Sequence, residues 1–139
     1  MRRISTLNPQ LSRVISETGH VDTLVVTDAG LPLPQGVERI DLAFRPGQPA
    51  FLDVLDTVLE SLSVEGAIAA EEVVEASPEM WQAMSSRLAE HNVTIELVPH
   101  VEFKELTKNA RACVRSGEFT SYANVILVAG VVYGGAAAV

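Results

Sequence analysis

Cysteine is almost absent from this sequence: Cys113 is its single thiol, so no disulfide can form within one chain. A structural zinc site would need several thiols or histidines at short spacing. The three histidines, at positions 20, 91 and 100, are too far apart in sequence for such a cluster. We therefore predict no metal site and interpret Cys113 as a small buried hydrophobic residue.

Basic residues are also scarce. The chain has 10 Lys and Arg against 18 Asp and Glu, which gives a formal net charge of -8 at pH 7. Such a chain cannot easily gather the positive potential that attracts phosphate backbones and anionic lipids. We therefore expect neither nucleic acid nor a membrane surface as a partner.

Long apolar runs are missing too. The longest, residues 123–133, is interrupted by Asn124 and Gly130 and is too short to span a bilayer. The basic start, Met1-Arg2-Arg3, is not followed by the apolar stretch of a signal peptide before Asn8-Pro9. We therefore expect the protein to stay in the cytoplasm.

The motifs of several common sites do not occur. The nine glycines form neither GxGxxG nor GxxxxGK[ST], so nothing predicts a cradle for nucleotide phosphates. A GxSxG elbow for a nucleophilic serine is absent as well. No repeat of 20 to 50 residues is visible, and 139 residues suffice for one domain with one core.

What the sequence contains is a regular alternation of helical and strand patterns. Asn8-Pro9 and Ser77-Pro78 each resemble an N-cap followed by proline at the first helical position, and Pro49 is expected to open a third helix. Helices are predicted over residues 9–18, 49–62, 78–91 and 101–108, and strands over 23–27, 37–44, 64–70, 93–98, 110–115 and 124–128. This order predicts a single α/β domain with a mainly parallel sheet flanked by helices.

Polar side chains stand where these apolar segments end. Open parallel sheets bind ligands beyond the carboxyl ends of their strands. Asp28 ends the first predicted strand, His100 follows the fourth, and Glu118 follows the fifth. Together with Tyr122 and Asn124 they offer the mixture of donors and acceptors that the hydroxyls of a neutral sugar require.

Each of these residues also has a simpler explanation. Asp28 before Ala-Gly is a common turn former, and His20 after Gly19 fits an exposed residue beyond a helix stop. His100 fits the start of a helix, and Tyr122 fits core packing. No single residue therefore identifies a sugar site.

The ordered set of motifs is more specific, and it resembles the D-ribose pyranase branch of the ribose pyranase and fucose mutarotase family. The resemblance runs from Leu7-Asn8 to about Tyr133. Gly30 and the start of the last motif, Gly117-Glu118-Phe119, favour the ribose branch over the fucose branch. The matching motifs are Gly19-His20, residues 28–32, 45–47, 49–51 and 102–104 with His100, residues 106–108, and residues 117–124.

The resemblance implies an isomerase that interconverts the pyranose and furanose forms of ribose without a metal or other cofactor. It implies a homodecamer and a sugar domain over residues 1–133, and the tail at 134–139 is expected to be disordered. It makes His20 the catalytic proton donor and assigns as sugar contacts Asp28, His100, Tyr122, Ala123 and Asn124.

The reaction itself needs proton transfer. Exchanging the ring size opens a hemiacetal, so one group protonates the ring oxygen while another removes the anomeric proton. An imidazole can do either near neutral pH. Two alternatives remain open: a fucose-type mutarotase, and a non-catalytic sugar-binding module of ribose uptake that would not need His20.

The sequence contains one geometrical conflict. His20 precedes the first predicted strand and Asp28 follows it, so the extended chain between them separates the two by roughly 20 Å or more. One ribose cannot span that distance. Unless the loop after Gly19 folds back, His20 must act on the sugar held by a neighbouring protomer, and we therefore predict a site shared between subunits.

Overall fold

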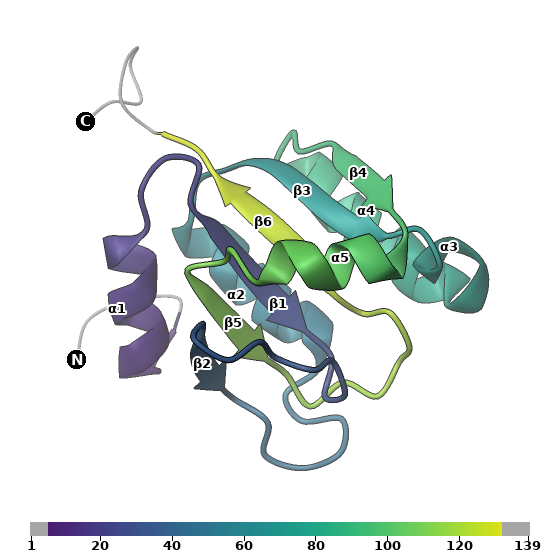
Figure 1. The fold of residues 1–139 in the computed structure, drawn as a ribbon, viewed down its shortest axis with the longest axis horizontal. Helices are drawn as coiled ribbons and strands as arrows, with labels where there is room; N and C mark the ends of the chain where they lie inside the picture. The colour runs from purple at the N-terminus through teal and green to yellow at the C-terminus, as the bar shows by residue number, and fades with distance from the viewer. Residues whose placement is uncertain (1–5, 132–139) are drawn as a thin grey trace.

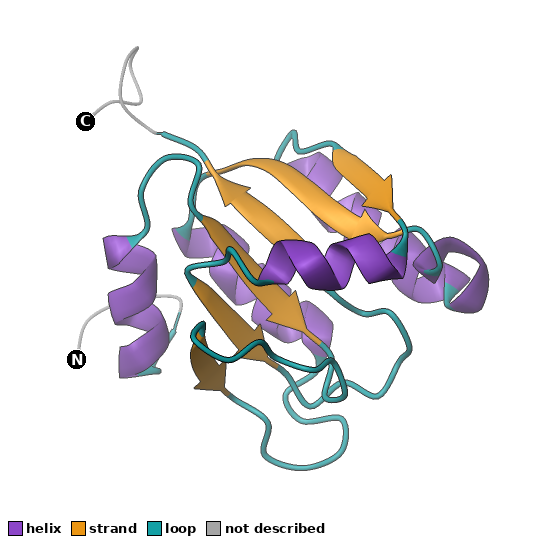
Figure 2. Cartoon of the chain, in the orientation of Figure 1, coloured by secondary structure: helices purple, strands orange, loops and turns teal. Residues whose placement is uncertain are grey.

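The computed structural model describes residues 6–131, which form one mixed six-stranded sheet with helices on both faces (Figures 1 and 2). The predicted tail at 134–139 lies outside the described residues. The helices are α1 (Pro9–Glu17), α2 (Phe51–Ser61), α3 (Val73–Ala76), α4 (Pro78–Glu90) and α5 (His100–Thr107). The strands are β1 (Thr23–Thr27), β2 (Glu38–Asp41), β3 (Val64–Ala70), β4 (Ile95–Val98), β5 (Ala112–Arg115) and β6 (Val125–Ala129).

The sheet has the strand order β2-β5-β1-β6-β3-β4. Five strands run in one direction, whereas β6 is antiparallel to both of its neighbours, β1 and β3. The reason is the connection after β5, which stays at the same edge of the sheet and has no crossover helix, so β6 has to run back. The predicted mainly parallel sheet is confirmed, with one antiparallel strand near its centre.

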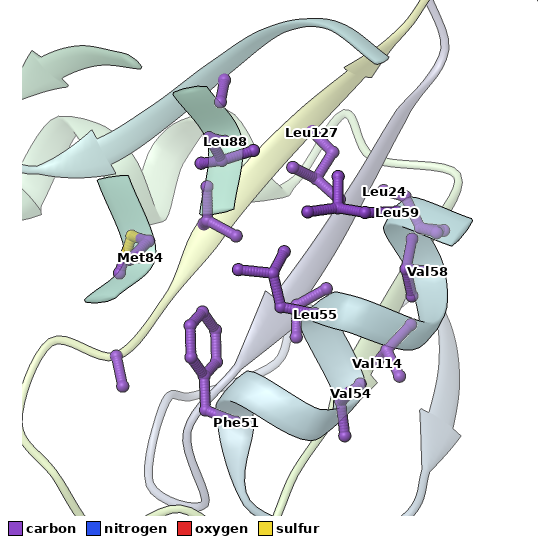
Figure 3. Close-up of a cluster of buried hydrophobic side chains, with 14 of the residues drawn as sticks. Leu24, Phe51, Val54, Leu55, Val58, Leu59, Met84, Leu88, Val114 and Leu127 are labelled. Atoms are coloured by element: carbon purple, nitrogen blue, oxygen red, sulfur yellow. The ribbon is translucent and has the colours of Figure 1, made fainter. Parts of the chain in front are cut away.

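The core has two layers, one on each face of the sheet. On one face α1, α2 and α4 pack against the sheet, and Figure 3 shows α2 side chains between Met84 and Leu88 of α4 and Leu24, Val114 and Leu127 of the strands. On the other face Phe103 of α5 packs with a smaller buried set that includes Cys113. The interpretation of Cys113 as a buried hydrophobic residue is therefore confirmed.

Local signals predicted the starts of α1 and α4 correctly, at Pro9 and Pro78, and placed the start of α2 two residues too early. Asn8 caps α1, since its side-chain oxygen accepts a hydrogen bond from the Leu11 amide at 2.8 Å. Pro49 does not open α2, which begins at Phe51. Ser77 does not cap α4 with its side chain, because its hydroxyl donates to the Ser121 carbonyl instead. In the part of the chain described, no helix has the length and apolar character needed to cross a bilayer.

Candidate functional site

A pocket of about 560 Å³ lies at the edge of the sheet where the parallel strands end and β6 begins. Its size falls within the range of small-molecule sites. The loop after β1, the start of α5 and the long loop between β5 and β6 form its walls. The lining residues are Asp28, Ala29, Gly30, Leu31, Pro32, His100, Arg115, Glu118, Phe119, Ser121, Tyr122 and Asn124.

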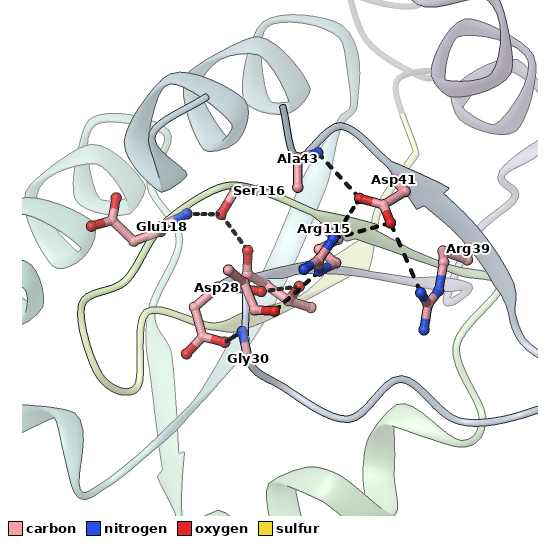
Figure 4. Close-up of polar contacts among 10 residues, drawn as sticks. Asp28, Gly30, Arg39, Asp41, Ala43, Arg115, Ser116 and Glu118 are labelled. Atoms are coloured by element: carbon pink, nitrogen blue, oxygen red, sulfur yellow. Dashed lines mark hydrogen bonds and ion pairs between the residues drawn. The ribbon is translucent and has the colours of Figure 1, made fainter. Parts of the chain in front are cut away.

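Asp28 and Asn124 form a hydrogen-bonded pair that joins the two walls. The Asp28 amide donates to Asn124 Oδ1 at 2.8 Å, and Asn124 Nδ2 donates to Asp28 Oδ2 at 3.2 Å. Asp28 Oδ1 also accepts from the amide of Gly30 (Figure 4) and from that of Leu31. Asp28 therefore forms the turn after β1, which is the simpler of the two roles considered for it, and it also lines the pocket.

Arg115, at the end of β5, fastens the Asp28 loop to its neighbours. Its Nε donates to the Ala29 carbonyl at 3.1 Å, and its Nη1 pairs with the Asp41 carboxylate at 3.0 Å (Figure 4). The Ala29 amide donates to the Glu118 carbonyl at 2.8 Å. Arg115 was not predicted as a site residue, because its only signal in the sequence is its charge at the end of an apolar strand.

Glu118 has a role that the sequence did not indicate. Its Oε1 accepts from the Phe51 amide at 3.0 Å and so caps α2, and its Oε2 accepts from the Thr120 hydroxyl at 2.7 Å. One carboxylate thus connects the start of α2 with the loop that carries Tyr122. The backbone of the same loop is held by Ser116, whose hydroxyl donates to the Thr27 carbonyl (Figure 4).

His100 opens α5 with its ring in the pocket. Its amide donates to the Glu72 carboxylate at 2.9 Å, and its ring meets Tyr122 edge-on at 5.1 Å between centroids. Its Nδ1 atom is buried and has no hydrogen-bond partner within residues 6–131. Buried polar atoms are rarely left unpaired, and this nitrogen is one that a ligand would satisfy only after the residues around it shift.

Tyr122 has a backbone φ of 63°, in the left-handed region that few non-glycine residues adopt. Such strain persists where the surrounding structure imposes it, and it gathers at ligand sites. Here the strained turn brings the tyrosine ring against His100. Ala123, which the resemblance assigns as a sugar contact, is buried in the core and does not line the pocket.

His20 lies outside the pocket. It belongs to the loop between α1 and β1, at the edge of the sheet where β1 begins, whereas Asp28 lies where β1 ends (Figure 1). The five residues of β1 alone extend over about 16 Å. The His20 side chain is half exposed, and its Nε2 lies 3.1 Å from Glu65 Oε1. One chain thus brings together Asp28, His100, Tyr122 and Asn124, but not His20.

Known proteins resemble this chain over nearly its whole length. The sequence profile of the RbsD / FucU transport protein family matches residues 1–132. A D-ribose pyranase of Laribacter hongkongensis (strain HLHK9) is 50% identical over 133 residues, which cover 96% of this chain and 100% of that protein. The chain belongs to the RbsD / FucU family. A D-ribose pyranase of Symbiobacterium thermophilum is 49% identical with the same coverage of both chains.

Two solved family structures hold a monosaccharide. Bacillus subtilis RbsD complexed with D-ribose has a TM-score of 0.89 at 44% identity, covering 94% of this chain and 98% of that one. The fucose mutarotase of Streptococcus pneumoniae in complex with L-fucose has a TM-score of 0.79 at 26% identity, covering 95% and 99%. The family resemblance and the fold class predicted from the sequence are therefore confirmed.

Proposed function

We propose that this protein is a D-ribose pyranase, an isomerase that interconverts the pyranose and furanose forms of ribose by opening and closing the ring. The observation that carries the proposal is the pocket at the strand ends, with a carboxylate, an imidazole and a tyrosine among its lining side chains. The family structure similar at 44% identity is a complex with D-ribose.

The pocket residues have separate tasks in this proposal. The Asp28 carboxylate accepts from a sugar hydroxyl, and the His100 imidazole hydrogen-bonds another. Tyr122 and Asn124 fix the orientation of the ring, which lowers the barrier by placement. The proton donor is His20, the residue to which the family resemblance assigns this role, and general acid–base chemistry can open a hemiacetal without a cofactor.

The position of His20 makes the assembly part of the proposal. His20 and the pocket lie at opposite edges of the sheet, so one chain does not offer both to the same ribose. We propose that the loop of a second copy carries its His20 to the pocket, in a homo-oligomer that the family resemblance predicts to be a decamer. Light scattering would measure the mass of this oligomer.

We also propose that the protein is located in the cytoplasm, which cell fractionation tests.

The deciding experiment is saturation-transfer NMR on ribose. We expect the purified protein to accelerate exchange between β-pyranose and furanose signals, and we expect the acceleration to survive EDTA. Loss of exchange on chelation, restored by added metal, would refute the metal-free mechanism. Binding of ribose without any acceleration would support the accessory module instead, and faster exchange of L-fucose than of ribose would support the mutarotase alternative.

A further inference from the structure

Glu65 contacts His20, the proposed proton donor, and both residues lie outside the sugar pocket. Its Oε1 lies 3.1 Å from Nε2 of His20, and the two side chains are 46% and 50% exposed. Glu65 is not among the residues that line the pocket. We propose that Glu65 is the positioning residue of His20, which holds the imidazole in one orientation and one tautomer for proton transfer. This inference rests on the proposed function.

The sheet is irregular at Glu65. In the pairing of β3 with β6, Val64 lies opposite Ala129 but Gly66 lies opposite Val128, so Glu65 is the extra residue of a β-bulge. Bulges redirect side chains and are frequent beside active sites. A Cβ atom at Gly130 would lie 3.2 Å from the Glu65 Cβ, so the glycine leaves the bulge room. The redirected side chain is the one that meets His20.

The loop that carries His20 is irregular as well. Val21 has a φ of 64°, which is a clear outlier for a β-branched residue, and its side chain is exposed. Its amide donates to the carbonyl of Ala129, the residue opposite the bulge, at 2.9 Å. The bulge and the left-handed Val21 thus meet at Ala129 of β6, and each contains or adjoins in sequence one member of the His20–Glu65 pair.

Asp22 fixes the other side of the loop. Its Oδ2 accepts from the Gly19 amide at 2.8 Å and from Arg111 Nε at 3.0 Å. The Gly19 amide, followed by the Arg111 guanidinium, lowers the pKa of the Asp22 carboxyl, so the carboxylate persists near neutral pH. The backbone that holds His20 is therefore fixed on both sides, and Glu65 sets the direction of its ring.

The chemistry of the pair follows from what a carboxylate can do. An ionised carboxylate only accepts hydrogen bonds, so the proton of a neutral His20 sits on Nε2, and Nδ1 is left free to take and return a proton. The same carboxylate stabilises the imidazolium that forms during the cycle. Because both side chains are about half exposed, the pair should contribute little to folding, so substitution of Glu65 should leave the stability of the fold nearly unchanged.

The first test compares two substitutions that remove a carboxylate charge from an exposed pair. Glu65→Gln should lower the exchange rate at saturating ribose by about 10-fold, a part of what a general acid–base group contributes. Ribose affinity should stay within about twofold, because Glu65 does not line the pocket. Glu17→Gln, which removes a 47% exposed partner of Arg13, should leave both quantities unchanged.

The second test observes the ring and needs no activity. Magic-angle-spinning NMR of the sedimented protein labelled with ¹⁵N-histidine should show His20 protonated at Nε2, with His20→Ala identifying its signals. Glu65→Ala removes the acceptor and should produce a mixture of tautomers. Glu65→Gln exchanging ribose as fast as Glu17→Gln, or Glu65→Ala leaving the tautomer unchanged, overturns the inference while the proposed function stands. A parent protein without exchange overturns both.

Discussion

Asp28 shows how one side chain shapes a loop and still serves a ligand. A carboxylate offers about four acceptor positions. The amides of Gly30 and Leu31 and the side chain of Asn124 occupy three of them. The remaining capacity is small and fixed in direction, which suits the recognition of a particular hydroxyl. The turn-forming and sugar-binding explanations of Asp28 are therefore compatible.

His20 and Asp28 should respond differently to truncation. We predict that His20→Ala lowers ribose exchange by roughly 10²-fold or more with ribose binding largely intact, since it removes an acid–base group. Asp28→Ala should also weaken binding, because it removes a pocket acceptor and three hydrogen bonds that hold the loop. Exchange by NMR and affinity by calorimetry measure the two effects. Exchange at the parent rate by His20→Ala would show that the proton donor is another group.

Cys113 should be chemically silent in the folded protein. It is buried between β1 and β2 in the sheet, and burial raises the pKa of its thiol to about 11. The reactive thiolate is therefore scarce at neutral pH. We predict no reaction with Ellman's reagent in buffer and one reactive thiol per chain in denaturant. Rapid labelling of the native protein would contradict this placement.

Whole elements differ in how much of them the sequence predicts. The bounds of β1 and β3 were predicted correctly from their mostly apolar sequences, because a strand with helices on both faces of its sheet needs apolar residues on both sides. The start of α2 could not be predicted, because its cap, Glu118, lies 67 residues away from Phe51. The short α3 also has no signal of its own.

The same distinction holds for the candidate site. Asp28 and His100 could be predicted as pocket residues from their positions after predicted strands, since ligands bind beyond the carboxyl ends of parallel strands. Arg115 was missed because its partners, Ala29 and Asp41, come from other parts of the chain. Glu65 was missed because a bulge depends on the register of two paired strands, which one strand's pattern does not reveal.

The loop that caps α2 packs so closely against residues 45–49 that a side chain at Gly117 would clash with their backbone. This close approach leads to a prediction about stability. The Gly117 amide donates to the Pro49 carbonyl at 2.8 Å, and a Cβ atom at Gly117 would lie 2.4 Å from the Gln48 carbonyl oxygen. We predict that Gly117→Ala lowers the free energy of unfolding by about 2–3 kcal/mol, because backbone must move. Denaturant unfolding measures the change.

The matched control is Gly66→Ala, in β3. A Cβ atom there would meet Val128 at 3.8 Å, an ordinary contact, and its φ does not lie in the left-handed region. We expect this variant to unfold within about 0.5 kcal/mol of the parent. Equal stability of the two variants would contradict the close approach of Gly117 to the loop at 45–49.

At the scale of the whole molecule, the antiparallel direction of β6 decides which residues lie at each end of the strands. Because the chain from β5 to β6 stays at the carboxyl edge, Tyr122 and Asn124 join Asp28 and His100 there. At the far end of β6, Ala129 pairs with the loop of His20. The same strand therefore begins at the pocket and ends at the proposed proton donor, about 16 Å away along the sheet.

This separation leads to a prediction about mixed assemblies. His20→Ala and Asp28→Ala subunits are each expected to be inactive alone, because every site in either oligomer lacks one group. If the site is shared, a mixed oligomer contains interfaces where an intact His20 from one chain faces an intact Asp28 pocket of another. Unfolding the two variants together and refolding them should therefore restore part of the ribose exchange. Native mass spectrometry of differently labelled subunits confirms the mixing. Confirmed mixing without any recovered exchange would place every catalytic group within one chain and would require the loop at 19–22 to leave Glu65 and fold back toward the pocket.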